Sequence, residues 1–339
     1  MKRLLYYAEV AKKLRPASMG PKLWNYLKYR FSSRNAVLSV RRYTPQIVCL
    51  LLTNRCNLNC SYCNAGKILD EGKTRQRENE ATLEKVQRIF ENPWFANALF
   101  VDLQGGEPLL VKDLDRIIVY LSKQGRMTNT STNGLLLAER ILDLKRAGIS
   151  RINVSLYEAN RSILERDLSK INSIFPVHAT YVLLRSEVEK QPEKILKIAR
   201  FIRESGCRSL RFFMYRPMGF NPKPDEILLE SHPSYREFRS RAEEALPGFC
   251  FFPPLVRKEG VRKLCPQLWQ RTGCDMSGQM IVCCGMNTLL GGASGNLFEA
   301  GIDAYNHPLM VDMRKQLMDP EVDPPEICKD CNLLGDPGW

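Results

Sequence analysis

The run CNLNCSYC, residues 56–63, directly follows an apolar, β-rich segment of this chain. An iron–sulfur cube normally takes four thiolates, one for each iron. Three cysteines within eight residues can hold three irons from a single loop and leave the fourth free to bind another molecule. The alternative is a zinc loop, but zinc takes four ligands and no fourth lies nearby in the sequence. The spacing therefore predicts a chemically active [4Fe-4S] cluster held by Cys56, Cys60 and Cys63.

The composition is that of a globular protein from a reducing compartment. The chain has 339 residues, 44% of them hydrophobic, and no apolar run approaches the length of a membrane span. The N-terminus lacks the continuous apolar stretch of a signal peptide. Twelve cysteines without a secretory signal indicate metal ligands and reduced thiols rather than disulfides. We therefore expect a cytoplasmic protein.

The positive charge is concentrated in residues 1–43, which form a basic N-terminal extension. This segment contains eleven Lys or Arg against the single acid Glu9, and the whole chain has a net charge of +13. Its apolar residues recur at helical spacing, which favours an amphipathic helix. Such a helix either packs on the domain with a solvated basic face or makes peripheral contact with an anionic membrane surface or substrate carrier. A nucleic-acid partner is not expected.

From residue 44 onward, short β-rich runs alternate with helical patterns. Six such repeats predict an α/β fold with a parallel sheet, either open and doubly wound or curled into a partial (β/α)6 TIM-like barrel over residues 44–219. Residues 220–255 are rich in proline and charge and predict a linker, and residues 256–339 predict a small C-terminal α+β unit with six cysteines. The predicted strands are Ile47–Leu52, Ala98–Leu103, Met127–Thr132, Arg151–Leu156, His178–Leu184 and Leu210–Tyr215.

Ligands gather at the carboxyl ends of the strands in such folds, and a second motif lies there. Gly105-Gly106-Glu107-Pro108 follows the second strand, at the same edge as the cysteine run. This stretch and the cysteine run, with Tyr62 before its last cysteine, resemble the radical S-adenosylmethionine (radical SAM) superfamily. The resemblance implies that the open iron chelates SAM, with Tyr62 beside it. It also implies that Gly105 and Gly106 let the backbone approach SAM closely and that Glu107 accepts its amino group.

Polar residues at the ends of the next strands are further candidates for binding SAM. Ser131 and Asn133 end the third strand and Ser155 ends the fourth, in segments that resemble those with which family members contact the ribose and carboxylate. Asn133 with the glycine after it is equally an ordinary turn. Arg185 follows the fifth strand and could pair with the SAM carboxylate, with a surface position as the alternative.

A second group of cysteines lies near the C-terminus. It resembles the auxiliary-cluster domain called SPASM, or its shorter twitch form, and implies one auxiliary [4Fe-4S] cluster sealed by four thiolates. A zinc site with four cysteine ligands is also compatible with the spacing. Cys284 is adjacent to Cys283, and only the spacing from Gly278 favours Cys283. The four predicted ligands are Cys265, Cys283, Cys328 and Cys331.

The resemblance also implies the chemistry. An electron donor of the flavodoxin or ferredoxin type reduces the cluster, SAM is cleaved, and a 5′-deoxyadenosyl radical removes a hydrogen atom from a substrate C–H bond. Electron loss to the auxiliary cluster then gives oxidation, whereas a hydrogen atom from a thiol gives epimerisation. Cys274 is the candidate hydrogen donor, with a structural role as the alternative. Glu158 and Tyr215 lie near strand ends and are further candidate catalytic residues.

The substrate class rests on the length of the extension. The 43 residues before the barrel are too few for a leader-binding winged-helix module, so we expect a small or carrier-linked substrate such as a sugar or aminocyclitol. Maturation of a ribosomal peptide, by epimerisation or crosslinking, is the alternative. A hypothesis of another class is a non-catalytic metal protein, either an electron carrier or a zinc-stabilised nucleic-acid binder that uses the basic extension.

Overall fold

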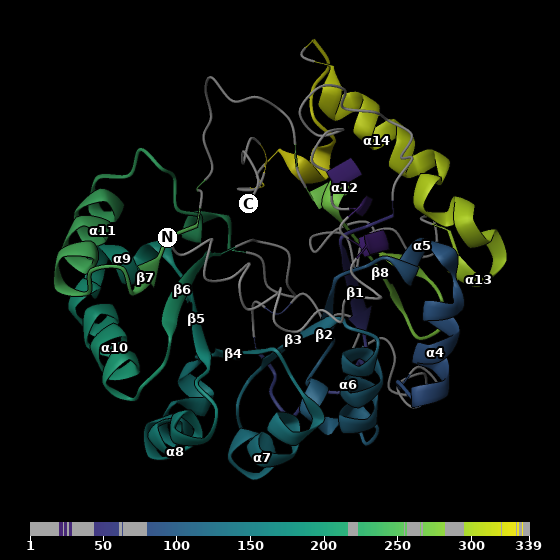
Figure 1. The fold of residues 1–339 in the computed structure, drawn as a ribbon. Helices are drawn as coiled ribbons and strands as arrows, with labels where there is room; N and C mark the ends of the chain where they lie inside the picture. Colours follow the sequence, from purple (N-terminus) through teal and green to yellow (C-terminus); the bar gives the residue numbers. More distant parts are fainter. Residues whose placement is uncertain are drawn as a thin grey trace.

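The protein is seen here as a computed structural model, drawn in Figure 1. The structure describes residues 20–22, 24, 25, 27, 28, 44–60, 63, 80–215, 223–253, 255, 265, 267–281, 295–319, 321–329, 331 and 334.

A nine-stranded sheet organises the described residues, with the strand order β7-β6-β5-β4-β3-β2-β1-β8-β9. Neighbouring strands are parallel, except that β9 runs antiparallel to β8. The strands are β1 Ile47–Leu51, β2 Phe100–Gln104, β3 Met127–Thr132, β4 Arg151–Ser155, β5 His178–Leu183, β6 Ser209–Met214, β7 Cys250–Phe251, β8 Arg271–Asp275 and β9 Met280–Ile281.

The predicted α/β fold is confirmed. All six predicted strands are present as β1 to β6, and β3 has the predicted bounds Met127–Thr132. The connections between these strands are helical, as parallel pairing requires. The helices are α4 Leu83–Glu91, α5 Pro93–Ala96, α6 Leu114–Lys123, α7 Leu137–Ala147, α8 Arg161–Ile174, α9 Arg185–Lys190, α10 Pro192–Glu204, α11 Pro233–Ala245, α12 Gln267–Gln270, α13 Leu297–Ala300 and α14 Pro308–Met318.

The core lies between one face of the sheet and the helices outside it (Figure 1). Side chains alternate along a strand, so Val48 and Leu50 of β1 face the helices and are fully buried there. Ile117 and Ile118 of α6 belong to the same apolar cluster. Each such side chain stabilises the fold by roughly 1.5–3 kcal/mol through burial. This packing fixes the register of the strands and therefore the positions of the loops at their carboxyl ends.

The opposite face of β2, β3, β4 and β8, which we call the concave face, is polar. Arg271 pairs with Asp102 at 2.6 Å, and the Asn129 amide donates to the second oxygen of Asp102 at 3.0 Å. The Asn153 amide donates to Asn129 at 2.7 Å, and Arg151 donates to Asn153 at 2.9 Å. Closed TIM barrels fill this space with branched apolar side chains. This row of hydrogen-bonded polar side chains instead suits a space that binds a polar molecule.

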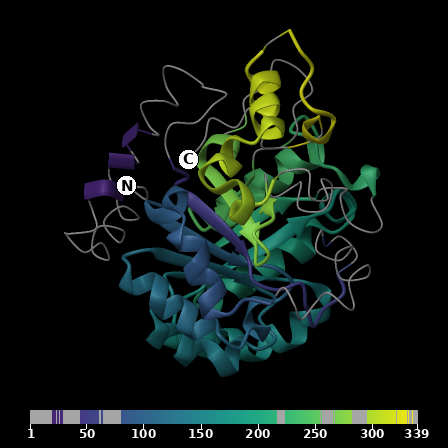
Figure 2. The same cartoon turned by 90° about the vertical axis from the view of Figure 1, so that its right-hand side faces the viewer.

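The sheet crosses the predicted boundaries of the linker and the C-terminal unit. Strand β7 pairs with β6, and β8 pairs with β1 over five residues. The guanidinium of Arg314, which is fully buried in α14, donates to the carbonyl of Leu268 at 3.2 Å. The C-terminal residues thus extend the barrel sheet through β8 and β9. Figures 1 and 2 both show the yellow C-terminal helices on the opposite side of the molecule from the blue-green α7 and α8.

Part of the basic extension is described, and it packs on the domain. The Lys22 ammonium donates to the carbonyl of Gln124 at 3.0 Å, and Asn25 exchanges two hydrogen bonds of 3.1 Å with the backbone of Thr44. Trp24 remains 61% exposed. The rest of the extension lies outside the described residues, and its membrane contact remains a prediction. None of the described helices has the length and apolar character needed to cross a bilayer.

Candidate functional site

The loops after β1 and β2 are joined by backbone hydrogen bonds. The amide of Gly106 donates to the carbonyl of Thr53 at 2.7 Å, and the amide of Glu107 donates to the carbonyl of Arg55, also at 2.7 Å. The sequence placed both motifs at the same edge of the sheet, and the structure confirms this. Because Arg55 directly precedes Cys56, the two hydrogen bonds fix the start of the cysteine loop.

The two glycines are required by this close approach. A Cβ atom on Gly105 would lie 2.3 Å from the carbonyl oxygen of Thr53, and one on Gly106 would lie 2.1 Å from the carbonyl oxygen of Arg55. Gly105 also has a φ of +138°, which side chains rarely adopt. The glycines were predicted to give room for SAM. In the structure, the atoms that a Cβ would meet first are those of the cysteine loop itself.

Glu107, the predicted acceptor for the SAM amino group, accepts hydrogen bonds from within the chain, and its contact with SAM remains a prediction. Its carboxylate is 1% exposed. It accepts hydrogen bonds from the hydroxyl of Thr132 at 2.7 Å, the amide of Asn133 at 2.8 Å and the amide of Leu109 at 3.0 Å. Burial raises the pKa of Glu107, and these donors oppose the shift. Glu107 therefore links the loops after β2 and β3 and acts as a positioning residue.

Asn133 lies between the third strand and the cysteine loop. Its side-chain amide donates to the side-chain oxygen of Asn57 at 2.7 Å and lies 3.9 Å from the sulfur of Cys56. Its own side-chain oxygen accepts from the amide of Leu135 at 3.0 Å. The predicted candidate is thus brought to the cluster loop, and its contact with SAM remains a prediction.

Cys56, Cys60 and Cys63 are half-buried on one loop. The pKa of Cys60 is raised to about 11, first by burial and then by the charges of Cys63 and Cys56. Burial also raises the pKa of Cys56. A bound iron–sulfur cluster supplies positive iron to three thiolates that otherwise repel one another, so the donor set fits the cluster. Within the described residues no three metal-binding side chains already converge; the assignment rests on the donor chemistry and on the place of the loop.

Asn160, which the sequence did not single out, joins the ends of β3 and β4. It is fully buried. Its amide donates to the carbonyl of Asn133 at 2.6 Å and to the carbonyl of Ser155 at 2.8 Å, and its oxygen accepts from the amide of Tyr157 at 2.8 Å. Both amide hydrogens and the oxygen are therefore used. In the sequence, an asparagine at the start of a helix looks like any other helix cap.

We expect Asn160→Asp to loosen this part of the site. The substitution keeps the size of the side chain. It replaces the amide group that donates to two carbonyl oxygens with a carboxylate oxygen, which can only accept. Leaving such buried groups unpaired costs about 1–3 kcal/mol each. The free energy of unfolding should fall by at least that amount in urea titrations, and SAM binding should weaken with it. Gln191→Glu makes the same amide-to-acid change at an exposed position and should leave both unchanged.

The remaining predicted SAM ligands are placed as follows. Ser131 and Ser155 are half-buried on the concave face, and the Ser155 hydroxyl accepts from Thr180 at 3.1 Å. Arg185 pairs with Glu189 of the same helix at 2.8 Å, and its side chain is 45% exposed. This ion pair favours the surface alternative for Arg185, and its contact with the SAM carboxylate remains a prediction. Tyr62 lies outside the described residues.

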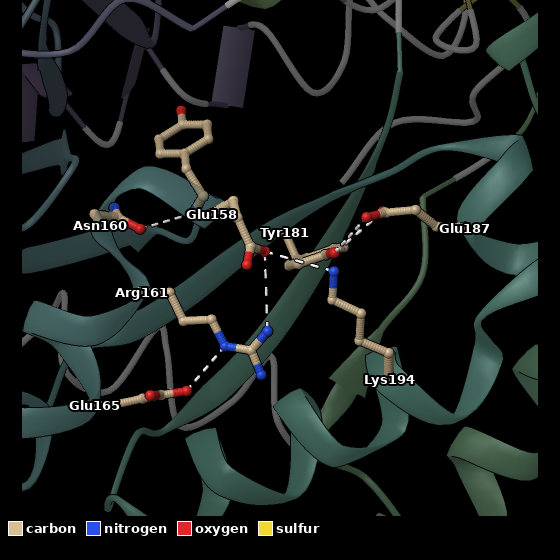
Figure 3. A network of polar contacts seen from close by, with 8 residues as sticks. Glu158, Asn160, Arg161, Glu165, Tyr181, Glu187 and Lys194 are labelled. Carbon is tan, nitrogen blue, oxygen red and sulfur yellow. Dashed lines mark hydrogen bonds and ion pairs between the residues drawn. The ribbon is translucent and has the colours of Figure 1, made fainter.

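The candidate catalytic residues come from three different parts of the chain, in β8, after β6 and after β4. Cys274 is fully buried, pairs with Leu50 across the β8–β1 ladder and faces the helical core. This position favours the structural role for Cys274, and its role as a hydrogen donor remains a prediction. The Tyr215 hydroxyl accepts from the amide of Lys223 at 2.9 Å and so anchors the chain after β6. Glu158 lines a pocket of about 530 Å³ and pairs with Lys194 at 3.5 Å (Figure 3).

The auxiliary cysteines are partly described. Cys265 is buried, and Cys328 and Cys331 are half-buried in one turn, in which the amide of Cys331 donates to the carbonyl of Cys328 at 3.0 Å. Cys283 lies outside the described residues. The turn places two thiols close in the chain, as a cluster ligand pair requires, and their shared ligation with Cys265 and Cys283 remains a prediction.

A parallel α/β sheet with a three-cysteine loop after β1 and a glycine-rich loop after β2 defines a class of enzyme built to hold an iron–sulfur cluster at the carboxyl edge of the sheet. The model of the radical SAM superfamily matches residues 50–232, more than half of the chain. The protein belongs to the radical SAM superfamily, whose cofactors are a [4Fe-4S] cluster and S-adenosylmethionine.

Curated relatives agree with this assignment. The GTP 3′,8-cyclase of Aquifex aeolicus is 32% identical over 189 residues, which cover 51% of this chain and 58% of that protein. A probable GTP 3′,8-cyclase of Methanocella arvoryzae is 40% identical over 110 residues, 32% of this chain and 34% of that protein. The chain thus spans little more than half of the Aquifex relative.

The fold matches that of a solved radical SAM enzyme. Streptococcus suis SuiB bound to S-adenosylmethionine has a TM-score of 0.65 at 14% identity, over 84% of this chain and 77% of SuiB. SuiB bound to its precursor peptide SuiA gives the same TM-score over 92% of this chain and 74% of SuiB, at 15% identity. At these identities the match establishes the shared fold.

Proposed function

We propose that this enzyme removes a hydrogen atom from a C–H bond of a small polar substrate. When bound, the cluster and SAM supply the chemistry, which is reductive cleavage of SAM to a 5′-deoxyadenosyl radical. The observation that carries the proposal is the joining of the cysteine loop to the Gly105–Glu107 loop at the carboxyl edge of the sheet. The chain's own residues hold that loop in place and enclose the reacting groups, which keeps water from the radical.

The concave face supports the substrate class. Its side chains offer hydrogen-bond donors and acceptors at several positions along the strands. Gln104, Ser131 and Ser155 lie near the carboxyl edge of the sheet. A hydroxyl-rich molecule such as a sugar or aminocyclitol, free or linked to a carrier, complements such a surface better than an apolar one. Because Cys274 faces the helical core, we favour oxidation of the substrate over epimerisation by this thiol.

The electron that oxidation releases needs an acceptor, and we assign that role to an auxiliary cluster ligated by Cys265, Cys283, Cys328 and Cys331. Cys331→Ala should then lower the iron content by about four per chain, the size of one cube. Cleavage of SAM under strong chemical reduction should persist, while substrate oxidation is lost. Zinc at this site in the unmodified protein, found by elemental analysis, would exclude the electron-transfer role.

A second candidate function is cyclisation of a purine nucleotide. It is favoured by the 32–40% identity of the matched segments to GTP 3′,8-cyclases, and it also uses a polar, sugar-bearing substrate. Peptide maturation, the alternative drawn from the sequence, remains a prediction.

The test is an anaerobic assay of the reconstituted enzyme with dithionite and SAM. We expect 5′-deoxyadenosine to form, and deuterium to move into it from the correct substrate when that substrate is labelled at the reacting carbon. Candidate sugars, aminocyclitols and GTP are supplied in parallel. Consumption of GTP alone would favour the second candidate, and absence of 5′-deoxyadenosine in every assay would contradict both.

A further inference from the structure

Two arginines and a histidine lie together on the concave face, on strands β4, β5 and β6. Arg151 begins β4, His178 begins β5, and Arg211 is the third residue of β6. The three strands are neighbours in the sheet (Figure 1). All three residues are half-buried. We call them the arginine–histidine group.

The strand register places Arg151 and His178 on the same face. His178 lies opposite Asn153 of β4, and Arg151 precedes Asn153 by two residues. Side chains two residues apart on a strand point to the same side. Accordingly, the guanidinium of Arg151 donates to the side-chain oxygen of Asn153 at 2.9 Å. Arg151 thus lies beside His178, one side-chain position closer to the amino ends of the strands.

Arg211 completes the group on the side of the carboxyl ends. It lies opposite Thr180, whose hydroxyl donates to that of Ser155 at 3.1 Å. Because His178 precedes Thr180 by two residues, His178 is about 7 Å along the strand from this row. Phe213, the next residue of β6 on the same face, is 44% exposed. Solvent therefore reaches this part of the concave face.

Positive charge surrounds His178. Burial and the charges of three arginines lower its pKa to about 3. These arginines are Arg151, Arg208 and Arg211. The imidazole is therefore neutral at pH 7, and its Nδ1 atom lies 2.7 Å from the hydroxyl of Ser209. When Nδ1 accepts from this hydroxyl, Nε2 carries the ring proton and can donate it to a ligand.

An acid on the same face is already used by another cation. Asp102 lies on β2, two strands from β4, and pairs with Arg271 at 2.6 Å. Its other oxygen accepts from Asn129 at 3.0 Å. The charges of Arg151 and Arg211 thus come together at His178 on a part of the face that favours an anion.

We propose that the arginine–histidine group binds a phosphoryl group of the substrate. Guanidinium groups present the paired N–H donors that phosphate oxygens accept, and His178 adds a neutral donor. The inference rests on the proposed function and narrows its substrate class to phosphorylated molecules. A phosphoryl group at His178 would lie about 7 Å from the row of Ser155, so the carbon skeleton attached to it would extend toward the carboxyl edge and the cysteine loop.

The test observes His178 directly, because the chain has only three histidines. Spectra of the holoenzyme with carbon-13-labelled histidine are recorded anaerobically, without a reductant, while inorganic phosphate is added at constant ionic strength. Acetate is the second probe, and His178→Gln assigns the signal. Arg211→Gln removes one guanidinium of the group. Arg146→Gln makes the same change on α7, where the side chain is 77% exposed.

Phosphate should shift the His178 signal and leave those of the other two histidines in place. The dissociation constant of phosphate should rise about tenfold in Arg211→Gln, as expected for the loss of a charge-assisted hydrogen bond. It should not change in Arg146→Gln. Arg211→Lys keeps the charge and covers the case in which Arg211→Gln fails to fold. Its dissociation constant should still rise, because an ammonium lacks the paired donors.

An unshifted His178 signal overturns the phosphoryl site. So does equal phosphate affinity in the Arg211 and Arg146 variants, or an equal response to acetate. These spectra do not require cleavage of SAM. Absence of 5′-deoxyadenosine with dithionite in the unmodified enzyme would therefore overturn the proposed function instead.

Discussion

Gly106→Ala is expected to prevent the enzyme from holding its cluster. The new methyl group would lie 2.1 Å from the carbonyl oxygen of Arg55, which is backbone and has no flexible end to move. Relief of the overlap requires separating the two loops and breaking the hydrogen bonds from Gly106 and Glu107. We expect a loss of about 3 kcal/mol in stability. Iron content after anaerobic reconstitution should fall, and SAM cleavage should fall to background.

The matched control for this prediction is Gly20→Ala. No atom lies within 4 Å of the Cβ position at Gly20, which is at the start of a described helical segment. The same added methyl group should therefore leave the unfolding midpoint and the iron content unchanged. Full iron content and normal turnover in Gly106→Ala would show that the close approach of the two loops is not required.

Cys60→Ala is expected to abolish SAM cleavage. Removing one of three thiolates leaves two iron ligands on the loop, too few to hold a cube with a single open iron. The absorbance and electron paramagnetic resonance signal of the SAM-binding cluster should disappear, and dithionite should yield no 5′-deoxyadenosine above background. The auxiliary cluster, if ligated as proposed, should keep its own signal.

Cys250→Ala is the control for the cysteine substitution. Cys250 is half-buried in β7, at the edge of the sheet, and is not one of the predicted cluster ligands. Its replacement should keep both the cluster signal and SAM cleavage. Retention of cleavage in Cys60→Ala, at the level of this control, would rule out Cys60 as a ligand.

The sequence predicted the six central strands because each is followed by a helix with a strong apolar face, and this alternation is a local signal. It did not predict that β8 would pair with β1. Residues 271–275, RTGCD, have little strand character of their own. Their extended conformation comes from pairing with Ile47–Leu51 across more than two hundred residues of chain. Such long-range pairing has no local pattern to reveal it.

For the site, the motifs identified the residues but not what they touch. Gly105, Gly106 and Glu107 were expected to contact SAM, which remains a prediction, and the structure adds their contacts with Thr53, Arg55 and the loop after β3. Contacts of this kind depend on how two loops meet in space. The sequence also could not predict on which face of the sheet the Cys274 side chain lies, because this depends on the register of β8 against β1.

The most direct test of the central claim is electron–nuclear double resonance on the dithionite-reduced enzyme, with SAM labelled by nitrogen-15 at its amino group. A cube held by Cys56, Cys60 and Cys63 leaves one iron to bind that nitrogen, so a hyperfine coupling should appear and should be absent in Cys60→Ala. A spectrum that labelled SAM does not alter, or a zinc ion with four protein ligands at the loop, would contradict the account.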